Sequence, residues 1–186
     1  MLKSSQREQF WYALYTRPRF EKKVDFILKQ KGLKSFLPLR NVIRYWSNGK
    51  KNILEPIFPS YVFVYANSQE RHLALQSYGV ARFVSFNGKP AHIPEEQIHD
   101  IHQILEFGCA PERVPYLVFG DKVEIVSGPL RGVEGFYVED RGMHRLVISV
   151  DIIRQAIAIT VDRDQIRRKP AMNDSSPGKN QKNGKT

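Results

Sequence analysis

Apolar and polar positions in residues 10–108 alternate between strand-like and helix-like segments. Runs rich in aromatic and β-branched side chains predict strands. Helices are predicted over about 18–31, 68–77 and 94–107, each beginning at a residue that favours a helix start. Between two extended runs, Asn48-Gly49 predicts a hairpin turn, because both residues tolerate positive φ. The predicted strands are Phe10–Thr16, Phe36–Trp46, Ile53–Ile57, Tyr61–Tyr65 and Val80–Phe86.

The pattern changes after residue 108. Residues 109–115 hold two prolines and no periodicity, which is typical of a linker. Short strand-like runs then follow at about ten-residue spacing with glycines between them, which predicts a small all-β barrel. The fold class is therefore α+β, an N-terminal antiparallel sheet with flanking helices followed by a small β-barrel. The predicted division is a polar tail 1–9, a domain 10–108, a linker 109–115, a barrel 116–169 with strands at 122–126, 133–139, 145–150 and 156–161, and a disordered basic tail 170–186.

Positive charge is concentrated in one stretch of the chain. The net charge is +10, and residues 17–51 alone hold eleven Lys and Arg against Glu21 and Asp25. Aromatic residues lie among these cations, and exposed rings can stack on nucleic-acid bases. Nucleic-acid binding is the favoured interpretation, with a plain solvated surface as the alternative. The interleaved aromatic residues are Tyr15, Phe20, Tyr45 and Trp46.

Motifs for catalysis are lacking in the sequence. There is no phosphate-binding loop, no Gly-x-Ser-x-Gly and no paired-histidine zinc helix. His99, Asp100 and His102 could share a helix face as a weak metal site, but a solvated polar face is the favoured reading. Cys109 stands alone in the predicted linker. Because catalytic motifs are lacking, we expect no enzymatic activity and no cofactor. With no apolar run of about 18 residues and no signal-peptide core, we expect a cytoplasmic protein without membrane spans.

Two aromatic segments, 56–64 and 80–86, are candidates for a partner site. Strand alternation sends Tyr61 and Phe63 to one face of the sheet and Val62 and Val64 to the other. Helices on one side would leave one aromatic set uncovered, and such a patch marks a partner site. The alternative, that both faces are core, remains open on periodicity alone.

Three motifs resemble one family. Gly120–Gly135 resembles a KOW motif, and Trp11–Tyr15 followed by a basic helix resembles the opening of the NusG N-terminal domain. Phe58–Val64 resembles the Phe-Pro-(Gly/Asn)-Tyr strand of that domain. The resemblance to the NusG family of transcription elongation factors covers about 10–169. Residues 16–23 and 118–135 are most similar to its specialised RfaH-like and UpxY-like antiterminators, which act on particular operons.

The resemblance implies a non-enzymatic, monomeric elongation and antitermination factor with a NusG-type N-terminal domain and an SH3-like KOW barrel. Such a factor binds RNA polymerase, suppresses pausing or termination, and is nucleoid-associated in the cytoplasm during transcription. The implied contacts with the polymerase β′ clamp helices are Tyr15, Phe58, Pro59, Tyr61, Phe63 and Phe83. Those with upstream or non-template DNA are Arg17, Arg19, Lys22, Lys23, Arg40 and Arg44. Those of the barrel with a small-subunit ribosomal protein or Rho are Leu130, Ile152, Ile153 and Arg154.

The chain also departs from the family pattern. RfaH-like proteins carry a His-Thr-Thr run at the β-subunit gate loop, where this chain has His72-Leu73-Ala74. Ile152-Ile153 stands where NusG often has Ile-Phe. RfaH can refold its C-terminal domain as helices, but the Val- and Ile-rich segment 116–169 predicts a barrel. The alternative function, a ribosomal or RNA-binding KOW protein, is disfavoured by the N-terminal Trp-Tyr strand.

Overall fold

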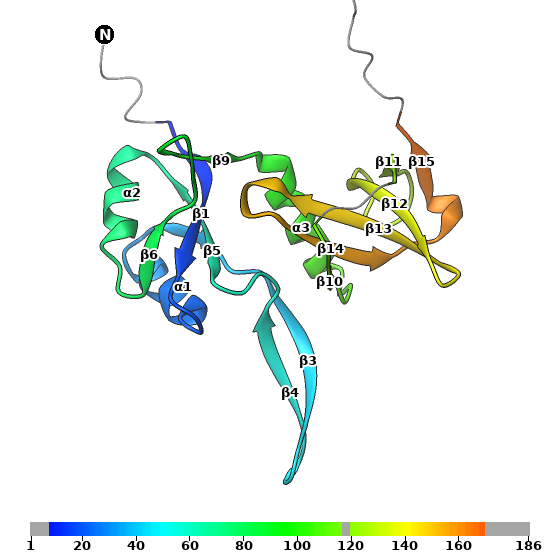
Figure 1. Ribbon diagram of the computed structural model, residues 1–186, viewed down its shortest axis with the longest axis horizontal. Helices are drawn as coiled ribbons and strands as arrows, with labels where there is room; N and C mark the ends of the chain where they lie inside the picture. The colour runs from blue at the N-terminus through cyan, green and yellow to red at the C-terminus, as the bar shows by residue number, and fades with distance from the viewer. Residues whose placement is uncertain (1–7, 117–119, 170–186) are drawn as a thin grey trace, which may run out of the picture.

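The computed structural model describes residues 8–116 and 120–169. Its first sheet is antiparallel and five-stranded. Its strands run in the order β2-β5-β1-β6, and β9 pairs with β1 (Figure 1). The central pair, β1 and β5, consists of the two strongest strand-like runs in the sequence. The strands are β1 (Phe10–Thr16), β2 (Lys34–Phe36), β5 (Tyr61–Ala66), β6 (Val80–Phe83) and β9 (His92–Ile93).

Two helices, α1 (Glu21–Gln30) and α2 (Ser68–Leu75), cover one face of this sheet. Alternation along the strands sends Leu14 and Val62 to that face, where they pack with Val24 of α1 in a buried cluster. The opposite face carries Trp11 of β1 and the three aromatic residues of β5, Tyr61, Phe63 and Tyr65. The predicted separation of the two side-chain sets is therefore confirmed.

Helix α1 begins later than the sequence predicts, and α2 has a different capping residue. Pro18 lies in a turn closed by Phe20 N–H donating to the Arg17 carbonyl (3.1 Å), and Arg19 has φ +66°, which an α-helix does not allow. The prediction of a helix from 18 was therefore wrong by three residues. In α2 the cap is Asn67, whose side chain forms a capping box with Glu70.

The predicted hairpin is confirmed as β3 (Leu39–Trp46) and β4 (Gly49–Pro56), which project away from the first sheet (Figure 1). Trp46 pairs with Gly49, so β4 begins four residues before the predicted strand at Ile53. The predicted strand Val80–Phe86 is divided at Val84, and a second short hairpin follows from β7 (Ser85–Phe86) and β8 (Lys89–Pro90).

The second sheet is antiparallel and six-stranded, in the order β10-β14-β13-β12-β11-β15. The four predicted strands are present as β11 (Asp121–Ile125), β12 (Glu134–Asp140), β13 (Met143–Val150) and β14 (Gln155–Thr160). Two strands were not predicted, β10 (Glu112–Val114) and β15 (Ile166–Arg168). The first corrects the linker: between its two prolines, three residues pair with β14. Short 3-10 helices, η1 (Asp151–Ile153) and η2 (Arg163–Gln165), precede β14 and β15.

Helix α3 (Glu95–Glu106) lies between the two sheets (Figure 1). Its buried Ile101 and Ile104 belong to one apolar cluster with Phe63 of β5 and Val133, which precedes β12. Gln103 Nε2 also donates to the carbonyl of Pro129, at 2.8 Å. The α+β class is thus confirmed, with α3 bridging the two sheets. The predicted disordered tail, 170–186, and residues 1–7 of the predicted polar tail lie outside the described residues.

Candidate functional site

Two half-exposed tyrosines meet on the face of the first sheet opposite α1 and α2. Tyr15 of β1 pairs with Tyr61 of β5, and their ring centroids are 5.4 Å apart at an interplanar angle of 69°. The guanidinium of Arg82, opposite Tyr15 on β6, lies 4.8 Å from the Tyr15 ring centroid. Burial raises the pKa of the Tyr61 hydroxyl, which therefore remains a hydrogen-bond donor near neutral pH. We call Tyr15, Tyr61 and Arg82 the tyrosine patch.

Phe58 and Phe63 lie beneath the surface. Phe58 is 1% exposed and Phe63 is 0% exposed, and their rings meet edge to face at 5.9 Å. Both belong to the apolar cluster that contains Ile101 and Ile104 of α3. The family resemblance implied that both residues contact polymerase, but in the structure they support the sheet from within. Pro59, between β4 and β5, is exposed.

Phe83 does not share the surface of Tyr15 and Tyr61. It pairs with Leu14 and lies on the face covered by the helices, buried against the Tyr12 ring at 5.7 Å. Successive residues of a strand point to opposite faces, so the neighbouring Arg82 takes the place expected for Phe83. Sequence reasoning missed Arg82, because its side depends on the pairing register of β6 with β1.

Glu21 connects the start of α1 to the loop below the patch. It is buried, and its Oε1 accepts a hydrogen bond from the Ser60 N–H at 2.7 Å. Ser60 has φ +66°, and its carbonyl accepts from the Thr16 N–H at 2.8 Å. The partial positive charge of a helix N-terminus favours a carboxylate in this position. Glu21 was not singled out from the sequence, although it is one of only two acids in the basic stretch.

The predicted cations Arg17, Arg19, Lys22 and Lys23 are all exposed and gather at the turn before α1 and in its first turn. We call these four residues the α1 basic group. Arg17 Cζ and Lys23 Nζ lie 5.6 and 4.9 Å from the ring centroid of Tyr78, an exposed residue that sequence reasoning also missed.

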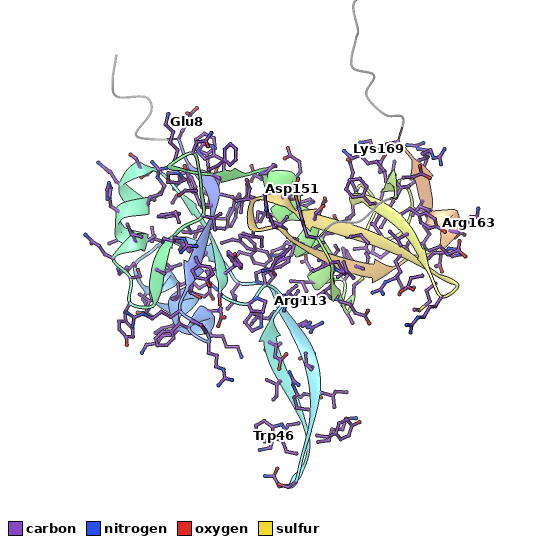
Figure 2. All side chains as sticks on the ribbon, in the orientation of Figure 1. Glu8, Trp46, Arg113, Asp151, Arg163 and Lys169 are labelled. Carbon is purple, nitrogen blue, oxygen red and sulfur yellow. The ribbon has the colours of Figure 1, made fainter. Side chains whose placement is uncertain are left out.

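The structure does not bring Arg40 and Arg44 together with the α1 basic group. Both lie on β3 and make contacts within the chain: Arg44 pairs with Glu55 at 2.8 Å, and Arg40 Nη1 donates to the Pro111 carbonyl at 3.3 Å. Nearer the tip of the hairpin, the Trp46 ring is exposed, and its side chain stands clear of the body in Figure 2. The basic stretch of the sequence therefore forms two separate surfaces.

The four residues assigned to the barrel partner are not equally accessible. Leu130 and Ile153 are buried in the apolar cluster, and Ile152 is half-buried against it. Arg154 is exposed and has φ +50°. Leu130 follows Pro129, whose carbonyl bonds to α3, so this turn of the second sheet faces the helix.

The candidate metal residues do not converge. In the ranges 8–116 and 120–169, no group of three or more His, Cys, Asp or Glu could hold a metal ion. His102 lies 3.7 Å from the Glu106 carboxylate, and its ring is 5.3 Å from that of Phe36. Burial raises the pKa of Asp100 to about 6, opposed by a backbone hydrogen bond from Glu134.

Cys109 is half-buried, and burial raises the pKa of its thiol. A thiol that stays protonated is a poor nucleophile, so its environment does not favour catalysis.

None of the helices in the described residues has the length and apolar character that a membrane span requires.

A family model and two curated relatives match this chain. The family model described as "Transcription termination factor nusG" matches residues 9–102. The transcription termination/antitermination protein NusG of Helicobacter pylori strain J99 is 24% identical over 174 residues, covering 85% of this chain and 97% of that protein. NusG of H. pylori strain 26695 matches with the same identity and coverage.

Solved structures also match along most of the chain. The structure titled "Domain interaction in Thermotoga maritima NusG" is 24% identical, covers 87% of this chain and 97% of its own, and has a TM-score of 0.49. Conformation B of the MjSpt4:Spt5 complex is 17% identical, covers 88% and 99% of the two chains, and has a TM-score of 0.28.

The structure thus presents an aromatic and arginine surface on one sheet, together with an exposed group of cations at the start of α1. Since the family model spans half of its length, the chain belongs to the NusG family of transcription termination and antitermination factors. Members of this family are non-enzymatic.

Proposed function

We propose that this protein binds RNA polymerase through the tyrosine patch, on the β′ clamp helices. The observation that carries the proposal is the pairing of Tyr15 with Tyr61 beside Arg82, on the face opposite α1 and α2. Tyrosine and arginine are enriched at the energetic centres of protein interfaces. Pro59 extends the patch, and Phe58 and Phe63 act through its support rather than by direct contact.

The α1 basic group then lies along upstream or non-template DNA. Its four cations are exposed at one end of α1, and Glu21 ties that end to the loop below the tyrosine patch. Binding to polymerase would therefore orient these cations toward neighbouring phosphates, which would hold the factor on the elongating complex.

The activity follows from binding and charge placement without group chemistry. The protein suppresses pausing or termination at particular operons, as its similarity to RfaH-like and UpxY-like factors implies. Residues 10–108 act as the polymerase-binding domain. Residues 116–169 act as a KOW barrel that contacts a small-subunit ribosomal protein or Rho through Arg154 and Ile152. We propose a monomer that works in the cytoplasm, at the nucleoid during transcription.

The test is capture of nucleic-acid-free core RNA polymerase by the tagged, full-length protein. Tyr61→Ala and Arg82→Ala should each weaken capture, because truncating a central interface side chain costs about 2 kcal/mol or more, roughly thirtyfold in affinity. In single-round transcription on a template with a strong pause, the same variants should fail to shorten the pause.

Tyr45→Ala is the matched control, since Tyr45 is 78% exposed on the projecting hairpin, outside the patch. It should retain capture of the nucleic-acid-free polymerase. Wild-type protein that does not retain polymerase, or patch variants that bind as well as Tyr45→Ala, would refute the proposal.

A further inference from the structure

The edge strand β10 covers only part of β14. Its three residues pair with residues 156–158, whereas β14 is the six-residue strand Gln155–Thr160. Pro111 and Pro115 stand on either side of β10, and a proline has no N–H to donate to a neighbouring strand. The two prolines therefore limit the pairing, and a chain without them could pair with more of the β14 edge.

Two arginines hold the β10 segment in place. Glu112 forms an ion pair with Arg145 of β13, and Arg40 Nη1, at the base of the β3–β4 hairpin, donates to the Pro111 carbonyl at 3.3 Å. Arg40 Nε is buried and has no hydrogen-bond partner in the described part of the chain. A short edge strand held by few contacts opens at a low free-energy cost, so β10 can leave while the rest of the sheet stays folded.

The side chains of β10 show what the covered edge accepts. Strand alternation sends Glu112 and Val114 to the same face of the second sheet. Glu112 Oε2 lies 2.5 Å from Arg145 Nη2, and Val114 packs against the small apolar cluster of Val147 and Ala158. The β14 edge therefore offers an extended chain one cationic position and one apolar position, two residues apart.

Arg145 requires a carboxylate at the cationic position. Its side chain is 13% exposed, and its other ion pair, with Asp140, is longer, at 3.7 Å. Its Nε is buried without a hydrogen-bond partner among residues 8–116 and 120–169. A nearly buried guanidinium that loses its nearest carboxylate is left with an uncompensated charge. A chain that replaces β10 is therefore favoured if it brings its own Asp or Glu to Arg145.

We propose that the β14 edge is a strand-addition site for an extended segment of a partner protein, and that β10 is a displaceable internal occupant of this site. Strand addition derives affinity from main-chain hydrogen bonds and specificity from alternate side chains. The segment that fits carries Asp or Glu, then any residue, then Val, Ile or Leu, with no proline among the paired residues. The proposal goes beyond the function proposed above and does not depend on the tyrosine patch or the α1 basic group.

A second copy of this chain is the less suitable occupant. Its own β10 would carry the same flanking prolines, Pro111 and Pro115, and would pair with no more of the β14 edge than the internal strand does. The internal strand also has the advantage of being tethered to the site, which a second copy lacks. A proline-free segment of another protein can offset that advantage with additional main-chain hydrogen bonds.

The test is an NMR titration of the full-length protein with a peptide that has the sequence of residues 110–116 and threonine in place of both prolines. A second peptide also has glutamine in place of the glutamate that corresponds to Glu112. The acidic peptide should bind about tenfold more tightly, because only it forms the ion pair with Arg145. Arg145→Met should remove this preference.

Binding of the peptide should also release β10. Saturating acidic peptide should speed amide hydrogen exchange at residues 112–114 of the protein. Glu112→Gln loosens β10 and leaves the β14 edge intact, so it should bind the acidic peptide up to about tenfold more tightly than wild type, since a larger fraction of the molecules has the edge open. Arg113→Gln is the matched control, because Arg113 is exposed on the same strand and forms no ion pair among the described residues. It should bind the peptide like wild type.

Absence of binding to Glu112→Gln, equal binding of the two peptides, or a preference that survives in Arg145→Met would overturn the proposal. Unchanged exchange at residues 112–114 with bound peptide would place the peptide elsewhere and would also overturn it. Dimerisation of Glu112→Gln in analytical ultracentrifugation, without peptide binding, would assign the edge to a second copy and exclude the partner segment. These measurements contain neither polymerase nor nucleic acid, so failure of the tyrosine patch is detected separately.

Discussion

Single residues of the candidate surfaces owe their positions to alternation along strands and to a few tight turns. Arg82 joins Tyr15 because the two pair across β1 and β6, while Phe83, one residue later, is buried under the helices. Gly79 and Glu21 then fix the loops that carry the exposed residues.

Gly79→Ala should destabilise the protein more than Gly88→Ala. Both glycines have positive φ, so both substitutions strain the backbone, but only the Gly79 Cβ meets other atoms, at 2.8 Å from Phe20 and 3.0 Å from Val24. Forcing a methyl into a packed site costs about 1–3 kcal/mol, the expected excess for Gly79. Urea unfolding of the two variants measures it. Equal losses would show that the turn can move away from α1.

Glu21→Ala should lower stability by about 1–3 kcal/mol, because it leaves the partly buried Ser60 N–H without its acceptor. Glu21→Gln keeps an acceptor oxygen and should lose less than Glu21→Ala. Thermal unfolding of both variants provides the comparison. If the glutamine variant is as unstable as the alanine variant, the hydrogen bond to Ser60 is not the stabilising contact.

At the scale of elements, β10 shows how a segment without periodicity becomes a strand. Its three residues pair with β14, and the Arg145 guanidinium bridges Glu112 of β10 (2.5 Å) and Asp140 of β12 (3.7 Å). Arg145 lies on β13, two strands away from β10 in the sheet order. A side chain thus holds the edge strand to the interior of the sheet.

Arg145→Met should loosen β10 without unfolding the sheet. Losing the bridge to Glu112 should speed amide hydrogen exchange at residues 112–114 by about tenfold, equivalent to about 1.4 kcal/mol of local opening free energy. Arg113→Met is the control, since Arg113 is an exposed cation on the same strand that forms no ion pair among the described residues. Unchanged exchange in Arg145→Met would assign the strand's stability to its backbone pairing alone.

For the whole molecule, α3 is the connection between the two sheets. Its isoleucines share one apolar cluster with both sheets, and Gln103 and Asp100 bond to residues of the second sheet. A cavity of about 950 Å³ lies beside it, and its lining includes Lys34, Asp100 and Glu134. Asp100 is thus a partly buried acid at the junction.

Asp100→Asn should become more stable relative to wild type as pH rises. Burial raises the folded-state pKa of Asp100 to about 6, from an ordinary value of 3.8, so the folded protein binds this proton more tightly than the unfolded chain. Wild-type stability should therefore fall between about pH 4 and pH 6 and stay level above it, whereas the neutral amide avoids that loss. The gain at pH 7 is on the order of 1 kcal/mol after allowance for solvent screening.

Melting temperatures of wild type and Asp100→Asn at intervals from pH 4 to pH 8 measure this difference. Glu95→Gln, at the exposed start of the same helix, is the control, since Glu95 forms no ion pair among the described residues, and it should show no trend specific to this window. A difference between wild type and Asp100→Asn that does not vary with pH would contradict the assigned burial of the carboxyl group.

Local pattern in the sequence determined the strands β1 and β5, the β3–β4 hairpin, the opposite faces of Tyr61 and Phe63 and of Val62 and Val64, the motifs of the NusG family and the cations at the start of α1. These features depend on side-chain periodicity, turn residues and charge within short stretches. Only the tertiary structure decided that Arg82 rather than Phe83 joins Tyr15, that Glu21 binds Ser60, that Tyr78 lies between Arg17 and Lys23, and that β10 joins the second sheet. Each of these depends on residues distant in sequence, whose meeting is set by strand register and helix packing rather than by any local pattern.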